Sequence, residues 1–102
     1  MKILVIGASG TVGSAAVKQL SPRHEIIAAG RSKGGVTVDL MSEDSIRAMF
    51  AKVGKVDAVV SAAGHVHFGP VSAMTPEQFR KGINDKLMGQ VNLVLLGHPS
   101  VN

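Results

Sequence analysis

The sequence contains no cysteine, no tyrosine and no tryptophan, and only three of its residues are phenylalanine. Without cysteine the chain has no disulfide, no thiolate nucleophile and no cysteine ligand for a metal, and this composition fits a reducing compartment such as the cytoplasm. The scarcity of aromatic rings leaves little from which to build the stacking platforms that bind single-stranded nucleic acid. We therefore expect a cytoplasmic protein that does not bind nucleic acid.

Long apolar stretches are absent as well. The apolar run over residues 3–6 is followed directly by Gly7, and so short a run before a glycine favours a buried strand over a signal peptide. No apolar stretch reaches the roughly 20 residues that a membrane-spanning helix needs. We therefore expect no membrane partner.

Positive charges outnumber negative ones, which gives the 102 residues a formal net charge of +4. The lysines and arginines are scattered along the chain, so an ordinary solvated surface with a phosphate-binding patch is favoured over a nucleic-acid interface. A content of 45% hydrophobic and 18% charged residues is typical of one small globular domain.

Short apolar runs alternate with helical patterns, which is the signature of β-α-β units and a parallel sheet. The predicted strands cover residues 2–7, 25–29, 36–38 and 56–62, and the predicted helices cover residues 10–20, 42–53 and about twenty residues from Thr75. The predicted fold class is α/β, a Rossmann-type doubly wound parallel sheet, of which the chain supplies strands 1–4 and the flanking helices.

The last predicted helix has a strong start signal. Thr75 can cap it, Pro76 suits its first turn, and Gln78 can complete a capping box. Apolar residues then recur every four positions until Gly97, at Phe79, Ile83, Leu87, Val91 and Leu95. This pattern predicts a long helix with one apolar face.

A doubly wound sheet of order 3-2-1-4-5-6 continues beyond its fourth strand. An apolar strand such as residues 56–62 that is left at an open edge invites pairing with another chain. We therefore expect residues 1–102 to be the N-terminal part of a single Rossmann domain, either a fragment or a chain completed by another chain, rather than a complete small domain.

The strongest functional signal is the segment GASGTVG at residues 7–13, between the first strand and the first helix. Gly7 allows a sharp turn, Gly10 lets the backbone approach a pyrophosphate, and Gly13 lets the helix pack closely on the sheet. The helix N-terminus then offers free N–H groups to phosphates. In this context we favour dinucleotide binding over a purely structural turn.

The end of the second strand bears on the choice of cofactor. NAD-specific sites usually carry an acidic residue there for the ribose 2′-hydroxyl, but this chain has Gly30-Arg31-Ser32-Lys33. Arg31 can pair with a 2′-phosphate, assisted by Ser32 and Lys33. An exposed basic turn is the other interpretation, and we favour NADP(H) over NAD(H).

Three segments together resemble the short-chain dehydrogenase/reductase family. They are the glycine loop at residues 7–13, Val38-Asp39-Leu40, and Ser61-Ala62-Ala63-Gly64. Their order and spacing match over essentially the whole chain. The resemblance implies that Asp39 binds the adenine amino group and that Leu40 packs on the adenine.

The same resemblance implies contacts elsewhere along the dinucleotide. The loop after the first strand would line the pyrophosphate and nicotinamide side, and the small residues after the fourth strand would lie under the nicotinamide ribose. The predicted cofactor-binding residues are Gly7, Ser9, Gly10, Thr11, Val12, Gly13, Arg31, Ser32, Asp39, Leu40, Ala62, Ala63 and Gly64.

Two positions depart from the family pattern. The family usually reads NNAG where this chain has Ser61-Ala62-Ala63-Gly64, so the amide side chains that brace the sheet are lost. In the long helix, Lys86 takes the place of the family Asn, with Gly89 at the glycine of the N-x-x-G pattern. Lys86 can organise a catalytic water, act there as a cation, or be a surface lysine, and all three readings stay open.

The family also uses a tyrosine as its acid–base group, and this sequence has none. The resemblance implies that the intact protein is an NADP-dependent oxidoreductase acting on a carbonyl or alcohol, and that these 102 residues alone are inactive. The alternative is a non-catalytic NADP-binding sensor or regulatory module. A Y-x-x-x-K motif in the gene beyond residue 102 would distinguish the two.

Two histidines are the remaining candidates for a metal site. His65 and His67 lie two residues apart, but two histidines without a third ligand do not make a zinc site, so we predict no metal. The expected partner is a small-molecule substrate. Because relatives often use the long helix for subunit contacts, we also expect a homo-oligomer.

Overall fold

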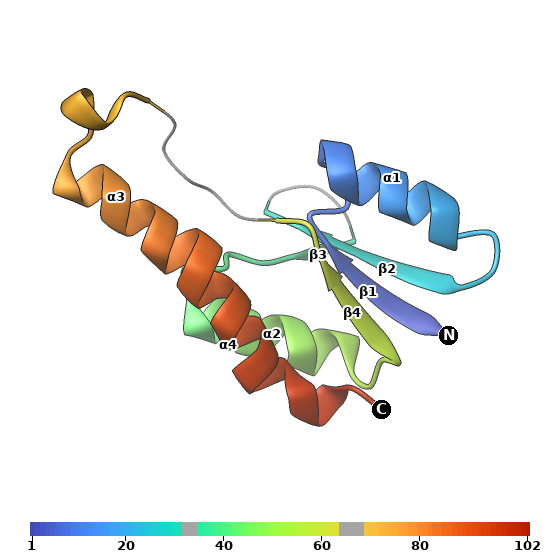
Figure 1. The fold of residues 1–102 in the computed structure, drawn as a ribbon. Helices are drawn as coiled ribbons and strands as arrows, with labels where there is room; N and C mark the ends of the chain where they lie inside the picture. The colour runs from blue at the N-terminus through green and yellow to red at the C-terminus, as the bar shows by residue number, and fades with distance from the viewer. Residues whose placement is uncertain (32–34, 64–68) are drawn as a thin grey trace.

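The computed structural model describes residues 1–31, 35–63 and 69–102. Its centre is a parallel sheet of four strands in the order β3-β2-β1-β4 (Figure 1). The strands are β1 (Lys2–Ile6), β2 (Glu25–Gly30), β3 (Val36–Thr37) and β4 (Ala58–Ser61). This order and the parallel pairing confirm the predicted doubly wound α/β fold.

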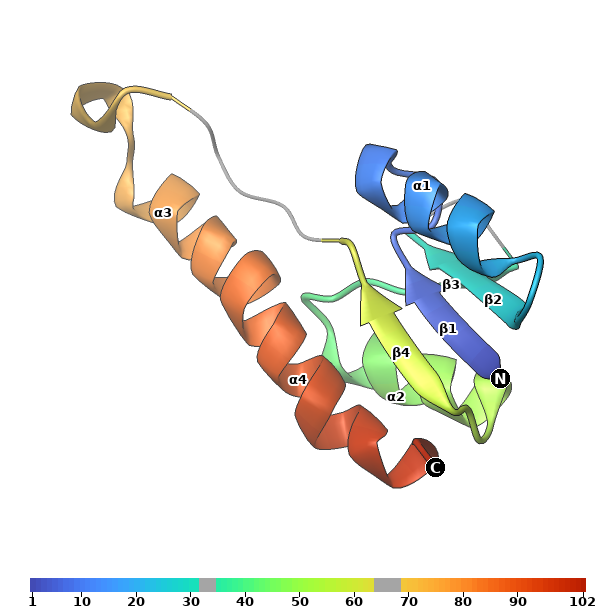
Figure 2. The ribbon, with the colours of Figure 1, turned by 45° about the vertical axis from the view of Figure 1, so that its right-hand side comes forward.

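Helices cover both faces of the sheet. Helix α1 (Thr11–Leu20) lies on one face, and α2 (Glu43–Val53) lies on the other together with the long C-terminal helix (Figures 1 and 2). The long helix consists of α3 (Pro76–Gly82), a π-helical turn η2 (Ile83–Leu87) and α4 (Met88–Gly97). A short 3-10 turn, Val71–Ala73, precedes it.

The core lies between the sheet and the layer formed by α2 and α4. Leu4 and Val5 of β1 and Ile46 of α2 are completely buried. Because β1 lies at the centre of a sheet that has helices on both faces, its residues are covered on both faces, which explains the continuous β-branched and leucine run in its sequence. Phe50 of α2 and Leu93 of α4 close the core on the helical side.

Side chains cap two helices, and the cap at Thr75 forms as the sequence predicts. The Ser45 backbone N–H donates to the Ser42 hydroxyl over 3.1 Å at the start of α2. At the start of α3, the Gln78 backbone N–H donates to the Thr75 hydroxyl and the Gln78 side chain accepts from the Thr75 N–H. These bonds satisfy backbone groups that a helix end otherwise leaves unpaired.

Two glycines bring α4 close to its neighbours. A Cβ atom at Gly89 would lie 2.9 Å from the Leu40 Cβ, and one at Gly97 would lie 2.3 Å from the Phe50 Cζ. The glycines therefore let the helix axis approach the segment after β3 and helix α2 more closely than larger residues would allow. This approach places the π-helical turn beside the carboxyl ends of the strands.

The amino end of the sheet is held by Asp57. Its carboxylate accepts hydrogen bonds from the Lys2 backbone N–H at 2.8 Å and from the Asn102 side chain at 3.1 Å. The strand predicted over residues 56–62 is shorter in the structure, because Val56 forms an isolated parallel bridge with Val101 instead of continuing β4. Within the described residues no helix has both the length and the apolar character needed to cross a membrane.

Candidate functional site

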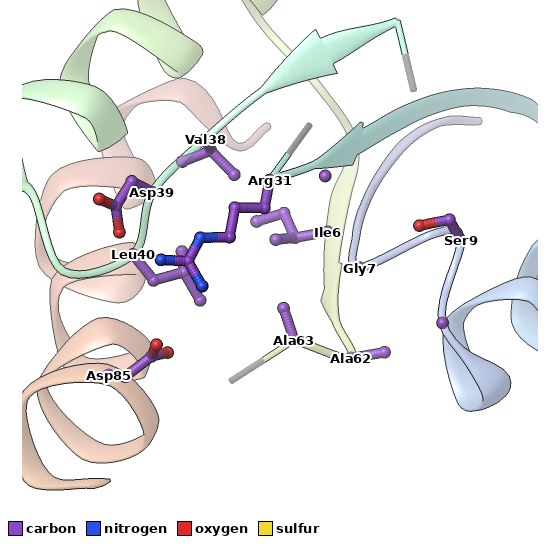
Figure 3. Close-up of a pocket in the computed structure, with 12 residues that line it drawn as sticks. Ile6, Gly7, Ser9, Arg31, Val38, Asp39, Leu40, Ala62, Ala63 and Asp85 are labelled. Atoms are coloured by element: carbon purple, nitrogen blue, oxygen red, sulfur yellow. The ribbon is translucent and has the colours of Figure 1, made fainter. Parts of the chain in front are cut away.

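A cleft of about 260 Å³ opens at the carboxyl ends of the strands. The loop after β1, the end of β2, the segment after β3 and the segment after β4 all contribute to its wall (Figure 3). In open α/β sheets this is where ligands bind. The lining residues are Ile6, Gly7, Ser9, Gly10, Gly30, Arg31, Val38, Asp39, Leu40, Ala62, Ala63 and Asp85.

The glycine loop depends on two glycines for its shape. Gly7 has a φ of +82°, in the left-handed region that favours glycine, and a Cβ atom there would lie 2.9 Å from the Ala62 backbone. A Cβ atom at Gly13 would lie 1.8 Å from the Gly7 carbonyl oxygen. The Gly7 N–H donates to the Ala29 carbonyl over 2.8 Å. The loop is therefore packed against β2, β4 and α1 at once.

Gly10 plays a different part. It is the N-cap of α1, where no side chain caps the helix and no acidic residue lies in the first turn. A Cβ atom at Gly10 would meet only the Gly7 oxygen, at an ordinary 3.5 Å. The protein itself therefore has room for a larger residue at position 10. The ten-residue helix presents its positive end and unpaired N–H groups beside the cleft, which suits an anionic group.

The opposite wall carries one cation, Arg31, and two carboxylates, Asp39 and Asp85, among apolar groups. Asp39 is held in place because one of its carboxylate oxygens accepts from the Met41 N–H at 3.0 Å and its own N–H donates to the Ser45 hydroxyl at 2.8 Å. Leu40 is buried, and Arg31 is exposed at the end of β2. Within the described ranges, the only ion pairs are those of Arg47, so no carboxylate neutralises Arg31.

Comparison with known proteins decides the family. The family model described as the NAD dependent epimerase/dehydratase family matches residues 3–97. The chain belongs to this family. Its predicted place among the short-chain dehydrogenases/reductases is also confirmed, and with it a nicotinamide cofactor as the ligand class of the family.

Solved structures agree over the whole chain. The protein lin1944 from Listeria innocua is 55% identical, with a TM-score of 0.97 over 100% of this chain and 51% of its own. A small-chain dehydrogenase in complex with NADPH is 24% identical, with a TM-score of 0.87 over 100% of this chain and 46% of its own. NADPH-bound carbonyl reductase from chicken fatty liver is 17% identical, with a TM-score of 0.84 over 97% of this chain and 47% of its own.

The last two similarities concern the fold alone, because both identities are low. The chain spans about half the length of each of these three proteins. A comparison with curated proteins gives no match.

Eight of the predicted cofactor residues line the cleft of this epimerase/dehydratase-family chain. They are Gly7, Ser9, Gly10, Arg31, Asp39, Leu40, Ala62 and Ala63. Thr11 and Val12 lie on the exposed surface of α1 next to the cleft, with Val12 71% exposed, and Gly13 is buried against Gly7. Ser32 and Gly64 lie outside the described residues, as do His65 and His67. Their predicted roles stay predictions.

The sequence reasoning missed Gln90, which braces the segment after β4. The Ser61 hydroxyl donates to the Gln90 Oε1 at 2.6 Å, and the Gln90 Nε2 donates to the Ala63 carbonyl at 3.0 Å. The family pattern has amide side chains within the NNAG segment, and here an amide from α4 fills that need. The only signal in the sequence was the loss of those amides, which required a replacement from some other element.

The π-helical turn separates the two neighbours Asp85 and Lys86. Asp85 is buried and lines the cleft, although the sequence reasoning did not select it. Lys86, predicted at the position of the family Asn, is exposed and lines a separate apolar groove with residues such as Phe79. The structure therefore does not bring Lys86 to the cleft, and its catalytic role stays a prediction.

Metal chemistry has no support in the described ranges. No group of three or more histidine, cysteine, aspartate or glutamate side chains is arranged to hold a metal ion among residues 1–31, 35–63 and 69–102. The cleft instead combines a helix N-terminus, the exposed Arg31, the carboxylates of Asp39 and Asp85, and apolar walls.

Proposed function

We propose that the protein is an NADP(H)-dependent oxidoreductase of the short-chain dehydrogenase/reductase type that acts on the carbonyl or alcohol group of a small molecule. The observation that carries the proposal is the pairing of two anion-binding features across one cleft. The N-terminus of α1 with Gly10 lies at one end, and Arg31 lies at the other beside Leu40 (Figure 3). A dinucleotide with a pyrophosphate and a 2′-phosphate has anionic groups for both.

The preference for NADP(H) over NAD(H) rests on the end of β2. No acidic residue follows Gly30 there, and Arg31 has no ion-pair partner within the described ranges. A carboxylate at this position would repel a 2′-phosphate, whereas a guanidinium attracts it. The family is described as NAD dependent, which names nicotinamide dinucleotides in general. Arg31 supports NADP(H) within that class.

The residues of this chain bind and orient the cofactor, which supplies the hydride chemistry when bound. Gly10 leaves space for the pyrophosphate, Gly7 makes the turn that places it, and Asp39 offers an acceptor to the adenine amino group. Gln90 fixes the Ala63 backbone under the nicotinamide side. Because the sequence has no tyrosine, no residue among these 102 takes the role of the family's acid–base group. We therefore expect the isolated 102 residues to be inactive.

Fluorescence titration with NADPH and NADH tests the proposal. We expect NADPH to bind more tightly than NADH. Arg31→Ala should weaken NADPH binding by about tenfold and leave NADH binding nearly unchanged. The effect is no larger because a charge-assisted hydrogen bond at an exposed site contributes free energy at the low end of the usual range. Arg47→Ala is the matched control, since Arg47 makes only surface ion pairs on α2. Equal binding of the two cofactors would refute the NADP preference, and binding of neither would refute the function.

A non-catalytic NADP-binding sensor is the second candidate. The unusual Ser61-Ala62 in place of two asparagines and Lys86 at the position of the family Asn favour it. NADPH oxidation in the presence of a panel of aldehydes and ketones distinguishes the two candidates. Turnover of any carbonyl compound by the intact protein supports the oxidoreductase, and tight NADPH binding by the intact protein without turnover supports the sensor.

A homo-oligomer is part of the same proposal. Large apolar side chains stand exposed along the long helix, including Phe79 at 63% and Leu95 at 61%. Exposed apolar surface of this kind often marks a subunit contact. Light scattering coupled to gel filtration should give the mass of a dimer or larger species, and a monomeric mass would contradict this part of the proposal.

A further inference from the structure

Asp85 is a buried acidic residue that the proposed function does not use. Only 6% of its surface is exposed, and it is the one buried charged residue in the described part of the chain. It lines the cleft, and Figure 3 shows its carboxylate directed away from its helix toward the space between Leu40 and Ala63. Among the described residues, no side chain or backbone group forms a hydrogen bond or ion pair with it. Within the described residues no fully buried side-chain oxygen or nitrogen lacks a hydrogen-bond partner, so the carboxylate keeps contact with the open cleft, where a ligand can donate to it.

The local helix geometry directs Asp85 into the cleft. It lies within the π-helical turn Ile83–Leu87, and turns of this kind are rare and are found mostly at functional sites. Four residues later, Gly89 packs against Leu40 without a side chain between them. The helix is therefore pressed onto the segment after β3, and the carboxylate of Asp85 lies on the same wall as Leu40 and Asp39.

A ligand in the cleft can supply a hydrogen-bond donor to Asp85. A metal ion would need further ligands, and the described residues form no such group. A phosphate is repelled by a carboxylate, so Asp85 does not serve the pyrophosphate or the 2′-phosphate. The apolar surface of Leu40 suits a flat heterocycle, and the amino group of adenine is a hydrogen-bond donor at the edge of that heterocycle.

We infer that Asp85 is a specificity-determining residue that accepts a hydrogen bond from the adenine amino group, so that this chain reads the base with two carboxylates, Asp39 and Asp85. The inference rests on the proposed function, because it assumes a dinucleotide in the cleft. A base with a carbonyl oxygen in place of the amino group would place an acceptor, rather than a donor, against two negative charges. Hypoxanthine and guanine dinucleotides are therefore rejected.

The test compares NADPH with its hypoxanthine analogue, reduced nicotinamide hypoxanthine dinucleotide phosphate. The protein should prefer NADPH by at least about tenfold, since a hydrogen bond to a charged group contributes that much or more. Asp85→Leu should weaken NADPH binding about tenfold and leave binding of the analogue unchanged or tighter. The preference for NADPH that remains would then be the part that Asp39 provides. Asp44→Asn is the control, since Asp44 lies on α2 with its side chain 98% exposed.

Asp85→Asn covers the case in which the leucine variant fails to fold. Asparagine has the same shape but can donate to the hypoxanthine carbonyl, so the preference for NADPH should fall by about tenfold or more. An unchanged preference in either folded variant overturns the inference and leaves NADP binding intact. If the unmodified protein binds neither nucleotide, the proposed function fails, and the inference fails with it.

Discussion

Replacing Gly13 by alanine tests whether the glycine loop is shaped by packing. The new Cβ atom would lie 1.8 Å from the Gly7 carbonyl oxygen, 2.6 Å from the Gly7 carbonyl carbon and 3.1 Å from the Ala8 Cα. All three atoms belong to the backbone, so no flexible side chain can move aside. To reach an ordinary contact, α1 would have to shift by more than about 1 Å away from the loop.

The size of the effect follows from two opposing contributions. Overpacking of this kind destabilises by roughly 1–3 kcal/mol, and the upper end applies because the contact is with backbone. Alanine inside a helix gains about 1 kcal/mol over glycine. We expect a net loss of about 2 kcal/mol in the free energy of unfolding. Because α1 moves with its N-terminus, the affinity for NADPH should fall as well.

Gly10→Ala is the matched comparison. Its Cβ atom meets nothing closer than 3.5 Å within the protein, so the stability should fall by about 1 kcal/mol or less, the usual effect of a poorer N-cap. The affinity for NADPH should nevertheless drop, because the methyl group occupies the approach of the pyrophosphate. Urea unfolding followed by circular dichroism measures the stability, since the sequence has no tryptophan for fluorescence. A Gly13→Ala variant as stable as the parent would refute the packing argument.

Two further predictions concern Gln90 and Asp57. Gln90→Leu removes the hydrogen bonds to Ser61 and to the Ala63 carbonyl, so NADPH affinity should fall several-fold at nearly unchanged helix content; unchanged affinity would show that the brace is irrelevant to binding. Hydrogen bonds from the Lys2 backbone, and secondarily from Asn102, hold the pKa of Asp57 below its ordinary value of 3.8. This carboxylate therefore stabilises the fold above about pH 3.8, and the stabilisation is lost as the pH falls below that value toward the folded pKa. Asp57→Asn should flatten the pH dependence of the unfolding free energy in that range, and parallel pH profiles for the two proteins would contradict this.

Local patterns were sufficient to predict most of the fold. The buried run of β1, the cap at Thr75 and Gly54, which ends α2 with a φ of +75°, each act within a few residues, so the sequence contains the whole signal. The start of β4 was misplaced because Val56 pairs with Val101. That contact joins residues 45 positions apart, and an alternation pattern cannot reveal it.

The parts of the site that depend on backbone conformation could be predicted from the sequence. The parts that depend on which side of the long helix a residue faces were harder to predict. Gly7 and Gly10 follow from the turn that they make, and both line the cleft. Lys86 was predicted at a catalytic position because it aligns with the Asn of the family's N-x-x-G pattern. That alignment assumes a regular helix. The π-helical turn places Asp85 on the cleft and leaves Lys86 on the other side. No propensity scale distinguishes such a turn from a regular one.

The central position of β1 has a consequence for how the chain forms during synthesis. β1 pairs with Glu25–Gly30 on one edge and with Ala58–Ser61 on the other. A ribosome that has released only the first half of the chain therefore presents β1 with one edge open, while α1 can already form from local contacts. Parallel pairing over such separations is slow. The pairing of β4 covers the second edge of β1, and the same strand completes the cleft.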